Sequence, residues 1–172
     1  ITITNPLNRL LLIPGRKNNL AATIYETFWV MSGNGNIGVL SHYLKRAPDF
    51  SDDAQTWRAA YGPRIRRWVG PEITEQSGIG DYPITTHIDQ VNLCYGILKK
   101  SLDSRQAVIT IFDPAQDFTQ SKDIPCNNQI YFLVRDGALD MTVNVRSNDL
   151  IWGYSSINVF EWTFLQQAMA EM

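Results

Sequence analysis

Apolar residues recur along this chain with two spacings, one typical of amphipathic helices and one typical of half-buried strands. Helical spacing predicts helices over residues 19–31, 37–44, 85–102 and from about 155 to 172. Asn19 suits the N-cap position of the first helix, whose large apolar residues share one face. In the last helix, the apolar positions predict a buried face made of Ile157, Phe160, Phe164, Ala168 and Met172.

Strand-like patterns occupy the chain between the last two predicted helices. Residues 107–113, AVITIFD, are a β-branched run typical of a buried strand. The segments QIYFLV (129–134) and LDMTVNV (139–145) lie on either side of Asp136-Gly137, which predicts a β-hairpin. The polar stretch 70–83 has no periodic pattern and is expected to be a surface loop.

Composition narrows the class of protein. With 172 residues, 44% of them apolar, the chain is expected to be a single domain over residues 1–172. Its net charge of −2 gives no reason to expect a nucleic-acid partner. No apolar run approaches the ~20 residues of a membrane span, and the first residues, ITITNP, lack the features of a signal peptide. We therefore expect a soluble, cytoplasmic protein.

Three arginines cluster in the segment YGPRIRRW, residues 61–68. Arg64, Arg66 and Arg67 would suit a small anion better than a nucleic acid, because the rest of the chain is not basic. The segment is compact and aromatic, and we expect an exposed loop with Trp68 packed inward.

The two cysteines stand in different contexts. Cys94 falls within the apolar stripe of a predicted helix, which indicates a buried, inert thiol. Cys126 follows a proline at the start of a strand, and the predicted hairpin brings Arg146 back to the same end of the sheet. A nearby cation favours the reactive thiolate, so Cys126 is either a structural cysteine or a nucleophile. Neither cysteine has a histidine at metal-ligand spacing, and no metal site is expected.

Five segments, in the same order, resemble thymidylate synthase and the related pyrimidine nucleotide hydroxymethylases. They are ETFWVMSGNGNI (26–37), Tyr61-Gly62 with Arg66, DSRQAVITIFDP (103–114), Pro125-Cys126-Asn127, and Arg146-Ser147-Asn148-Asp149 with Gly153. Asn127 stands where the family has a histidine, and Gln106 where it has a second arginine. Asn158 matches the family's asparagine after a one-residue insertion. The chain up to Met172 shows no counterpart of the family's His-x-Tyr segment or lid, so we expect it to lack the family's C-terminal part.

The resemblance implies an α/β (α+β) thymidylate-synthase-like fold. In that fold a large mixed sheet is flanked by helices, and one sheet face packs against its twin in a homodimer. The implied reaction transfers a one-carbon unit from 5,10-methylenetetrahydrofolate to C5 of a pyrimidine nucleoside monophosphate. The principal interpretation is methyl transfer, dUMP to dTMP. The alternatives are 5-hydroxymethylation of dUMP, dCMP or CMP, a catalytically impaired nucleotide-binding relative, and an unrelated α/β domain.

The resemblance also implies catalytic roles for four residues. Cys126 would add to C6 of the pyrimidine. Glu26 would organise proton transfer at O4 and at N5 of the folate, although on pattern alone a glutamate inside a helix indicates a solvated position. Tyr61 would belong to the network that removes the C5 proton. Asp149 would face the pterin of the folate.

Four further residues would bind the nucleotide. Arg146 and Ser147 would hold its phosphate, as a guanidinium fork and a hydroxyl do. Arg105 would reach the phosphate bound by the partner subunit. Asn158 would read the pyrimidine edge, because an amide offers both a donor and an acceptor.

Overall fold

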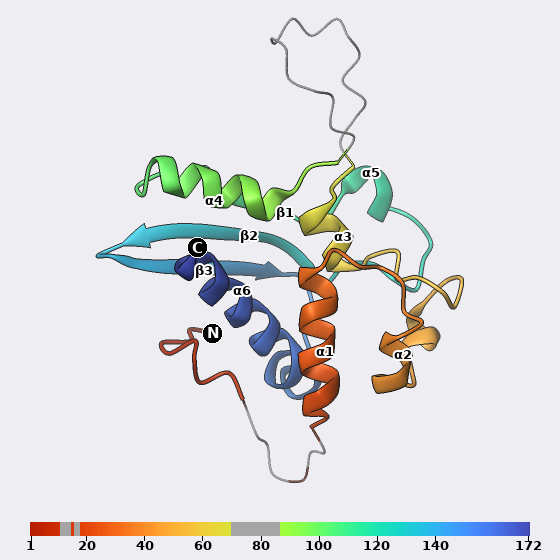
Figure 1. Cartoon of the computed structure of the whole chain (residues 1–172). Helices are drawn as coiled ribbons and strands as arrows, with labels where there is room; N and C mark the ends of the chain where they lie inside the picture. The colour runs from red at the N-terminus through yellow and green to blue at the C-terminus, as the bar shows by residue number, and fades with distance from the viewer. Residues whose placement is uncertain (11–14, 16–17, 70–86) are drawn as a thin grey trace, which may run out of the picture.

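The predicted helices and strands are present with shorter bounds, and three short helices that the patterns did not predict lie between them, at Ala47–Phe50, Tyr61–Arg66 and Pro114–Asp117. The computed structural model (Figure 1) describes residues 1–10, 15, 18–69 and 87–172, so the loop expected at 70–83 lies outside the described residues. The helices are α1 (Leu20–Met31), α2 (Leu40–Tyr43), η1 (Ala47–Phe50), α3 (Tyr61–Arg66), α4 (Gln90–Lys100), α5 (Pro114–Asp117), η2 (Leu150–Asn158) and α6 (Val159–Glu171). The strands are β1 (Val108–Thr110), β2 (Asn127–Arg135) and β3 (Ala138–Val145).

The described strands form a three-stranded antiparallel sheet in the order β1-β2-β3. The predicted hairpin is confirmed. Asp136 and Gly137 both have positive φ, +50° and +75°, as a two-residue turn that matches the strand twist requires. The mixture of helices and sheet confirms the expected α/β class. The sheet differs from the large mixed one expected, because β1, β2 and β3 each pair with a neighbour running in the opposite direction.

Helices cover both faces of the sheet. Helix α4 packs on β1, while α6 packs on β3 and α1 packs against α6 (Figure 1). The core between them contains Ile109, Ile130 and Phe132 from the sheet, together with Leu165 and Met169 from α6. Among the described residues, no helix is long and apolar enough to cross a membrane.

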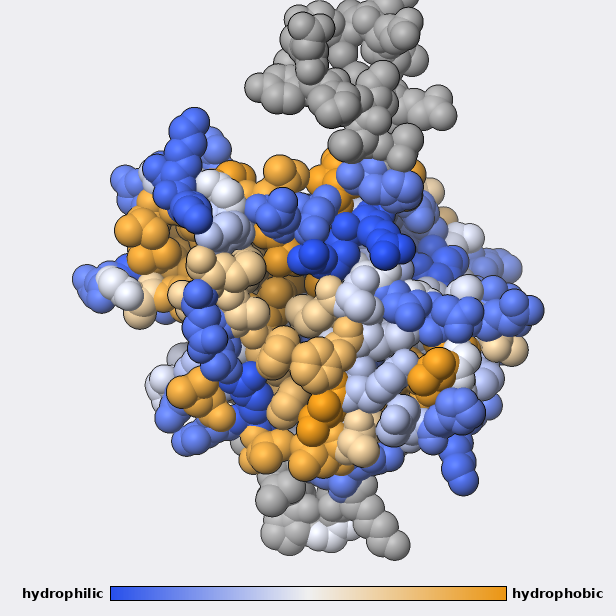
Figure 2. Space-filling model, in the orientation of Figure 1, coloured by the Kyte–Doolittle hydropathy of each residue, from blue (hydrophilic) through white to orange (hydrophobic). Residues whose placement is uncertain are grey.

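Helix α1 is capped as predicted but is buried on a different face. The side chain of Asn19 accepts a hydrogen bond from the N–H of Ala22, at 3.0 Å. The large apolar residues that share one face, Leu20, Ile24 and Phe28, remain 38–57% exposed. Figure 2 shows apolar side chains gathered on this side of the molecule. The face turned toward the core consists of Ala22, Thr23, Thr27, Trp29 and Val30.

The predicted core face of the last helix is wrong. Helix α6 starts at Val159, after the π-wound segment η2, and it buries Val159, Glu161, Trp162, Thr163, Leu165 and Met169. Phe160 and Phe164 are only half-buried, and Met172 is exposed. The two phenylalanines lie under the guanidinium of Arg9, and Phe28 packs edge-on against Phe164. The N-terminal segment thus covers the face predicted to be core.

Candidate active site

A cavity of about 720 Å³ lies among α1, α3, η2 and the segment that precedes β2. Glu26, Tyr61, Cys126 and Asn158 all line it, so the structure brings together four of the predicted site residues from distant parts of the chain. Arg105, Arg146, Ser147 and Asp149 are not among the residues that line it. A second, more open hollow of about 770 Å³ is lined by residues 32–36, 56, 57, 63, 67, 69 and 87, and it contains none of the predicted site residues.

Cys126 is half-buried in the cavity wall, immediately before β2. The pairing of β2 with β3 shifts register between Asn127 and Gln129, which marks a bulge beside the thiol. Such bulges redirect side chains and are common near active sites. Cys94, by contrast, is buried as predicted, and burial raises the pKa of its thiol to about 11. The two cysteines therefore differ in access.

Arg146 lies beside the Cys126 segment, as the hairpin predicts. Its backbone N–H donates to the carbonyl of Cys126 at 2.9 Å. Its guanidinium donates to the carbonyls of Pro125 and Ile124, at 2.9 and 3.0 Å. A guanidinium has five N–H donors, and Arg146 is exposed. It therefore fixes the backbone before the thiol and retains donors for an anion.

The other three predicted residues outside the cavity wall are exposed. Ser147 follows Arg146 directly, and Asp149 accepts a hydrogen bond from the N–H of Ile151 at 2.9 Å, at the start of η2. Arg105 precedes β1 and is likewise not among the residues that line the cavity.

Glu26 occupies a buried site, which the pattern of α1 did not indicate. The residue is half-buried, but its Oε2 is shielded from solvent and has no hydrogen-bond partner among the described residues. Burial disfavours the charged form of a carboxyl, and here it raises the pKa of Glu26 to about 7. The group can therefore gain and lose a proton near neutral pH, as an acid–base catalyst must.

Tyr61 is placed by the close packing of α3 against the end of α1. A Cβ at the next residue, Gly62, would lie 2.7 Å from the carbonyl oxygen of Asn34 and 2.9 Å from that of Val30, so only glycine fits there. Burial and the charges of Glu161 and Cys126 raise the pKa of Tyr61 well above its usual range, while polar groups of Asn127 act in the opposite direction. Its hydroxyl thus stays protonated and can donate.

Asn158 ends η2, whose nine residues are wound as a π-helix. Such segments are rare and often occur at functional sites, because they turn side chains away from the regular helical positions. Asn158 is half-buried and lines the cavity together with Gly153 and Ile157. An amide that is reachable from the cavity can bind a polar ring edge.

Sequence patterns missed Glu161, which lies in the first turn of α6. It is 1% exposed, its Oε1 has no hydrogen-bond partner among the described residues, and its charge interacts with those of Glu26 and Tyr61. No family motif includes it, and it stands between the aromatic residues Phe160 and Trp162. A carboxyl between two aromatic residues is the one sequence signal that could have found it.

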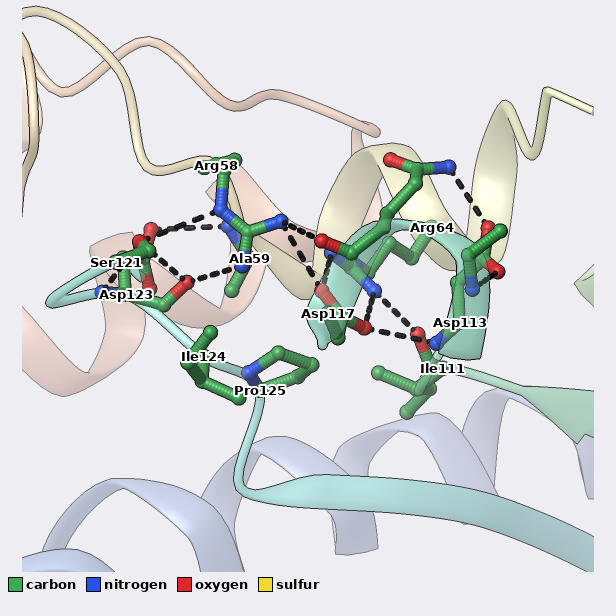
Figure 3. Close-up of polar contacts among 12 residues, drawn as sticks. Arg58, Ala59, Arg64, Ile111, Asp113, Asp117, Ser121, Asp123, Ile124 and Pro125 are labelled. Atoms are coloured by element: carbon green, nitrogen blue, oxygen red, sulfur yellow. Dashed lines mark hydrogen bonds and ion pairs between the residues drawn. The ribbon is translucent and has the colours of Figure 1, made fainter. Parts of the chain in front are cut away.

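A buried ionic network holds the segments on either side of the site together (Figure 3). Arg64 donates to both carboxylate oxygens of Asp117, at 2.6 and 2.8 Å, and to the carbonyl of Ile111 at 2.7 Å. Arg58 contacts Asp117 at 3.1 Å and donates to the carbonyl of Asp123 at 2.7 Å. The network thus links α3, α5 and the chain that leads to Cys126.

This network corrects the prediction for residues 61–68. The segment is helix α3 up to Arg66 rather than an exposed loop, and Trp68 is half-buried. Arg64 is buried against Asp117, and Arg66 pairs with Asp89 at 3.0 Å. Both guanidinium groups are therefore used within the fold, because internal carboxylates lie nearby to compensate their charge. An anion site built on this arginine cluster is not supported.

Comparison with known proteins identifies the relatives of this chain. The family model for thymidylate synthase matches residues 5–172. Similar curated proteins are the deoxyuridylate hydroxymethyltransferases of Delftia phage PhiW-14, Bacillus phage SP01 and Pseudomonas phage M6, at 38%, 35% and 32% identity. The matches cover 98%, 99% and 96% of this chain and 45%, 43% and 43% of those proteins. The chain thus spans less than half the length of the relatives it matches.

The described part of the chain contains no group of three His, Cys, Asp or Glu residues that could hold a metal ion. The cavity, the cysteine segment and the order of the motifs in this chain agree with the match of the thymidylate synthase family model to residues 5–172. The chain therefore belongs to the thymidylate synthase family.

Proposed function

We propose that this chain carries the nucleotide site of an enzyme that hydroxymethylates C5 of dUMP. The single observation that carries the proposal is that Cys126, Glu26, Tyr61 and Asn158 line one cavity. The names of the three phage relatives support hydroxymethyl transfer over methyl transfer. The reaction class follows from the family, and the substrate from those names.

The nucleophile is Cys126. Its sulfur adds to C6 of the pyrimidine, which splits a difficult substitution into two easier steps and makes C5 nucleophilic. Glu26, half-buried with its pKa raised to about 7, exchanges a proton with the O4 side of the ring. Tyr61, whose hydroxyl stays protonated, takes part in removing the C5 proton.

Protein groups orient the nucleotide at its base and at its phosphate. Asn158 binds the pyrimidine edge through its amide. Arg146 and Ser147, which lie next to each other after β3, bind the phosphate. Arg105 is exposed and does not line the cavity, and in this proposal it binds the phosphate of a second subunit in a homodimer, as the family resemblance implies.

The cavity also fits the folate co-substrate. Besides the nucleotide groups, its wall contains the aromatic residues Tyr43, Phe50 and Trp57, which suit a flat ring system. Its volume lies within the range of about 300–1,000 Å³ typical of small-molecule sites. 5,10-Methylenetetrahydrofolate supplies the one-carbon unit that C5 receives. In this proposal the aromatic wall and Asp149 hold the folate.

Methyl transfer from dUMP to dTMP is the second candidate. The two reactions share every step up to an exocyclic methylene at C5, and they differ in whether water or hydride is added to it. The family match over residues 5–172 favours this second candidate as much as the first. The product therefore has to be identified directly.

Release of tritium from C5-labelled dUMP in the presence of methylenetetrahydrofolate tests the proposal. We expect release by the full-length protein and a loss of at least about 10³-fold in Cys126→Ala, because the C6 adduct cannot form. Cys94→Ala, which removes the buried thiol, is the matched control and should retain activity. Parallel assays with dCMP and CMP test the choice of base and sugar.

Two results would contradict this. Tritium release that survives Cys126→Ala would exclude the covalent mechanism. Binding of dUMP that Cys126→Ser leaves unchanged, without any tritium release by the unaltered protein, would favour a nucleotide-binding relative that has lost activity.

A further inference from the structure

Glu161 is a buried acid for which the proposed mechanism gives no role. It is 1% exposed and forms no ion pair with the residues that the structure describes. Burying an ionised carboxylate without a partner costs several kcal/mol. An apolar residue would fill the same place in α6 without that cost. The position of Glu161 therefore points to a use for its carboxyl group.

Buried polar atoms near Glu161 form a cluster with Tyr61. Four buried atoms without a hydrogen-bond partner among the described residues belong to it, namely Glu26 Oε2, Glu161 Oε1, Asn127 Oδ1 and Trp162 Nε1. Tyr61 connects them, because its ring lies 5.5 Å from that of Trp162 and polar groups of Asn127 act on the pKa of its hydroxyl. A cluster with two to four convergent polar atoms is what binds an internal water.

The two carboxyls in this cluster influence each other. Burial raises the pKa of Glu161 well above its ordinary value, and the charge of Glu26 raises it further. Burial raises the pKa of Glu26 to about 7. Two nearby buried carboxyls cannot both ionise easily, so such a pair titrates in two separate steps. At a pH between the two steps, Glu26 and Glu161 together hold a single proton.

Other charges around α6 do not alter this picture. The titratable groups that interact electrostatically with Glu161 are Glu26 of α1 and Tyr61 of α3, and Cys126 interacts in turn with Tyr61. Arg9 contacts the rings of Phe160 and Phe164, and its guanidinium donates to the side chain of Gln167 on α6. On β3, which also packs against α6, the acidic residue Asp140 is exposed.

We propose that Glu161 is a positioning residue that shares one proton with Glu26 and, through Glu26, orients the water that adds to the exocyclic methylene. This inference rests on the proposed function. The water oxygen bonds to the methylene carbon, the π electrons of the methylene move to the C4 enolate, and the water proton passes to the carboxyl pair. The enolate then expels the Cys126 thiolate and restores the C5–C6 double bond.

The pairing can be tested without any activity. Carbon-13 NMR of labelled glutamate carboxyls in the full-length protein follows the ionisation of Glu26, assigned with Glu26→Gln. We expect a two-step titration in the unaltered protein and in Glu161→Asp, and a single step in Glu161→Gln. Glu171→Gln, on the exposed end of the same helix, should change nothing. A Glu26 titration that is identical with and without the Glu161 carboxyl would overturn the proposal.

A second measurement tests the role in catalysis. In Glu161→Gln, we expect the rate of 5-hydroxymethyl product formation to fall at least tenfold. Single-turnover release of C5 tritium and the KM for dUMP should change less than twofold, because they precede water addition. Glu161→Asp should recover part of the loss. Equal losses in both rates would indicate a merely structural role and overturn the proposal. No tritium release by the unaltered protein would instead refute the proposed function, while the titration still decides the pairing.

Discussion

At the residue scale, burial decides which chemistry each group can perform. Glu26 and Cys126 show this most clearly, because the helical and strand patterns give both residues ordinary structural roles. In the folded chain Glu26 has a shielded carboxylate oxygen, and Cys126 faces the same cavity. The other cysteine, Cys94, is buried in the core. Local surroundings, rather than residue type, separate the groups proposed to react from the thiol proposed to be inert.

The raised pKa of Glu26 predicts how stability depends on pH. The carboxyl of Glu26 is harder to ionise in the folded protein than in the unfolded chain. Its protonated form therefore stabilises the folded state fully below pH 4.5, the ordinary pKa, and this contribution is lost as pH rises through about 7. We expect the free energy of unfolding, measured by urea denaturation, to fall over this range. In Glu26→Gln the fall should be smaller by about 3–4 kcal/mol, since each pKa unit is worth ~1.4 kcal/mol. If the free energy of unfolding falls equally with pH in the two proteins, the raised pKa of Glu26 is contradicted.

Residue patterns predicted part of the site and missed part of it. Cys126, Tyr61 and Asn158 carry motifs that can be read from the sequence, and they do line one cavity. Glu161 carries no motif, and its burial depends on which face of α6 turns inward. That face could not be predicted, because it depends on where η2 ends and on how the N-terminal segment covers Phe160 and Phe164.

At the element scale, local signals determined the outcome where they were strong. The Asp136-Gly137 turn and the Asn19 cap both act on neighbouring backbone groups, so the hairpin and the start of α1 were predictable. The fate of Arg64 depends on Asp117, which lies 53 residues further along the chain. A sequence pattern shows no such long-range pairing, and the arginine cluster was therefore assigned wrongly to an anion site.

The Arg64–Asp117 pair predicts a large stability effect. Burial alone raises the pKa of Asp117, but hydrogen bonds from Arg64 and its neighbours outweigh burial and lower it. Asp117→Asn leaves a buried guanidinium without its counter-charge, which costs about 3–5 kcal/mol. We expect a correspondingly lower denaturation midpoint in urea. Asp49→Asn removes the exposed partner of Arg46 and should cost less than about 1 kcal/mol. Similar losses in both variants would refute the structural role of the network.

At the scale of the whole molecule, the site is assembled from segments far apart in the sequence. Glu26, Tyr61, Cys126 and Asn158 come from two helices, a loop and the end of η2, and they meet only when α1 and α3 pack beside the β2–β3 hairpin. Arg105 does not line the cavity. The proposed phosphate contact from Arg105 is assigned to a second copy of the chain.

Mixing two inactive variants tests that requirement. Arg105→Ala retains Cys126, and Cys126→Ala retains Arg105, so each mixed dimer would contain one intact site. If subunits exchange at random, half of the dimers are mixed and activity should return to about a quarter of the unaltered level. The rate of C5 tritium release after mixing measures this. A mixture that stays inactive after subunit exchange has been verified would exclude a shared site.

The central claim is that water, rather than hydride, completes the reaction at C5. The most direct test is to run the reaction with dUMP and methylenetetrahydrofolate in ¹⁸O-labelled water and to analyse the nucleotide by mass spectrometry. We predict 5-hydroxymethyl-dUMP that carries ¹⁸O, together with tetrahydrofolate. Formation of dTMP without the label, together with dihydrofolate, would contradict the claim and assign methyl transfer to this protein.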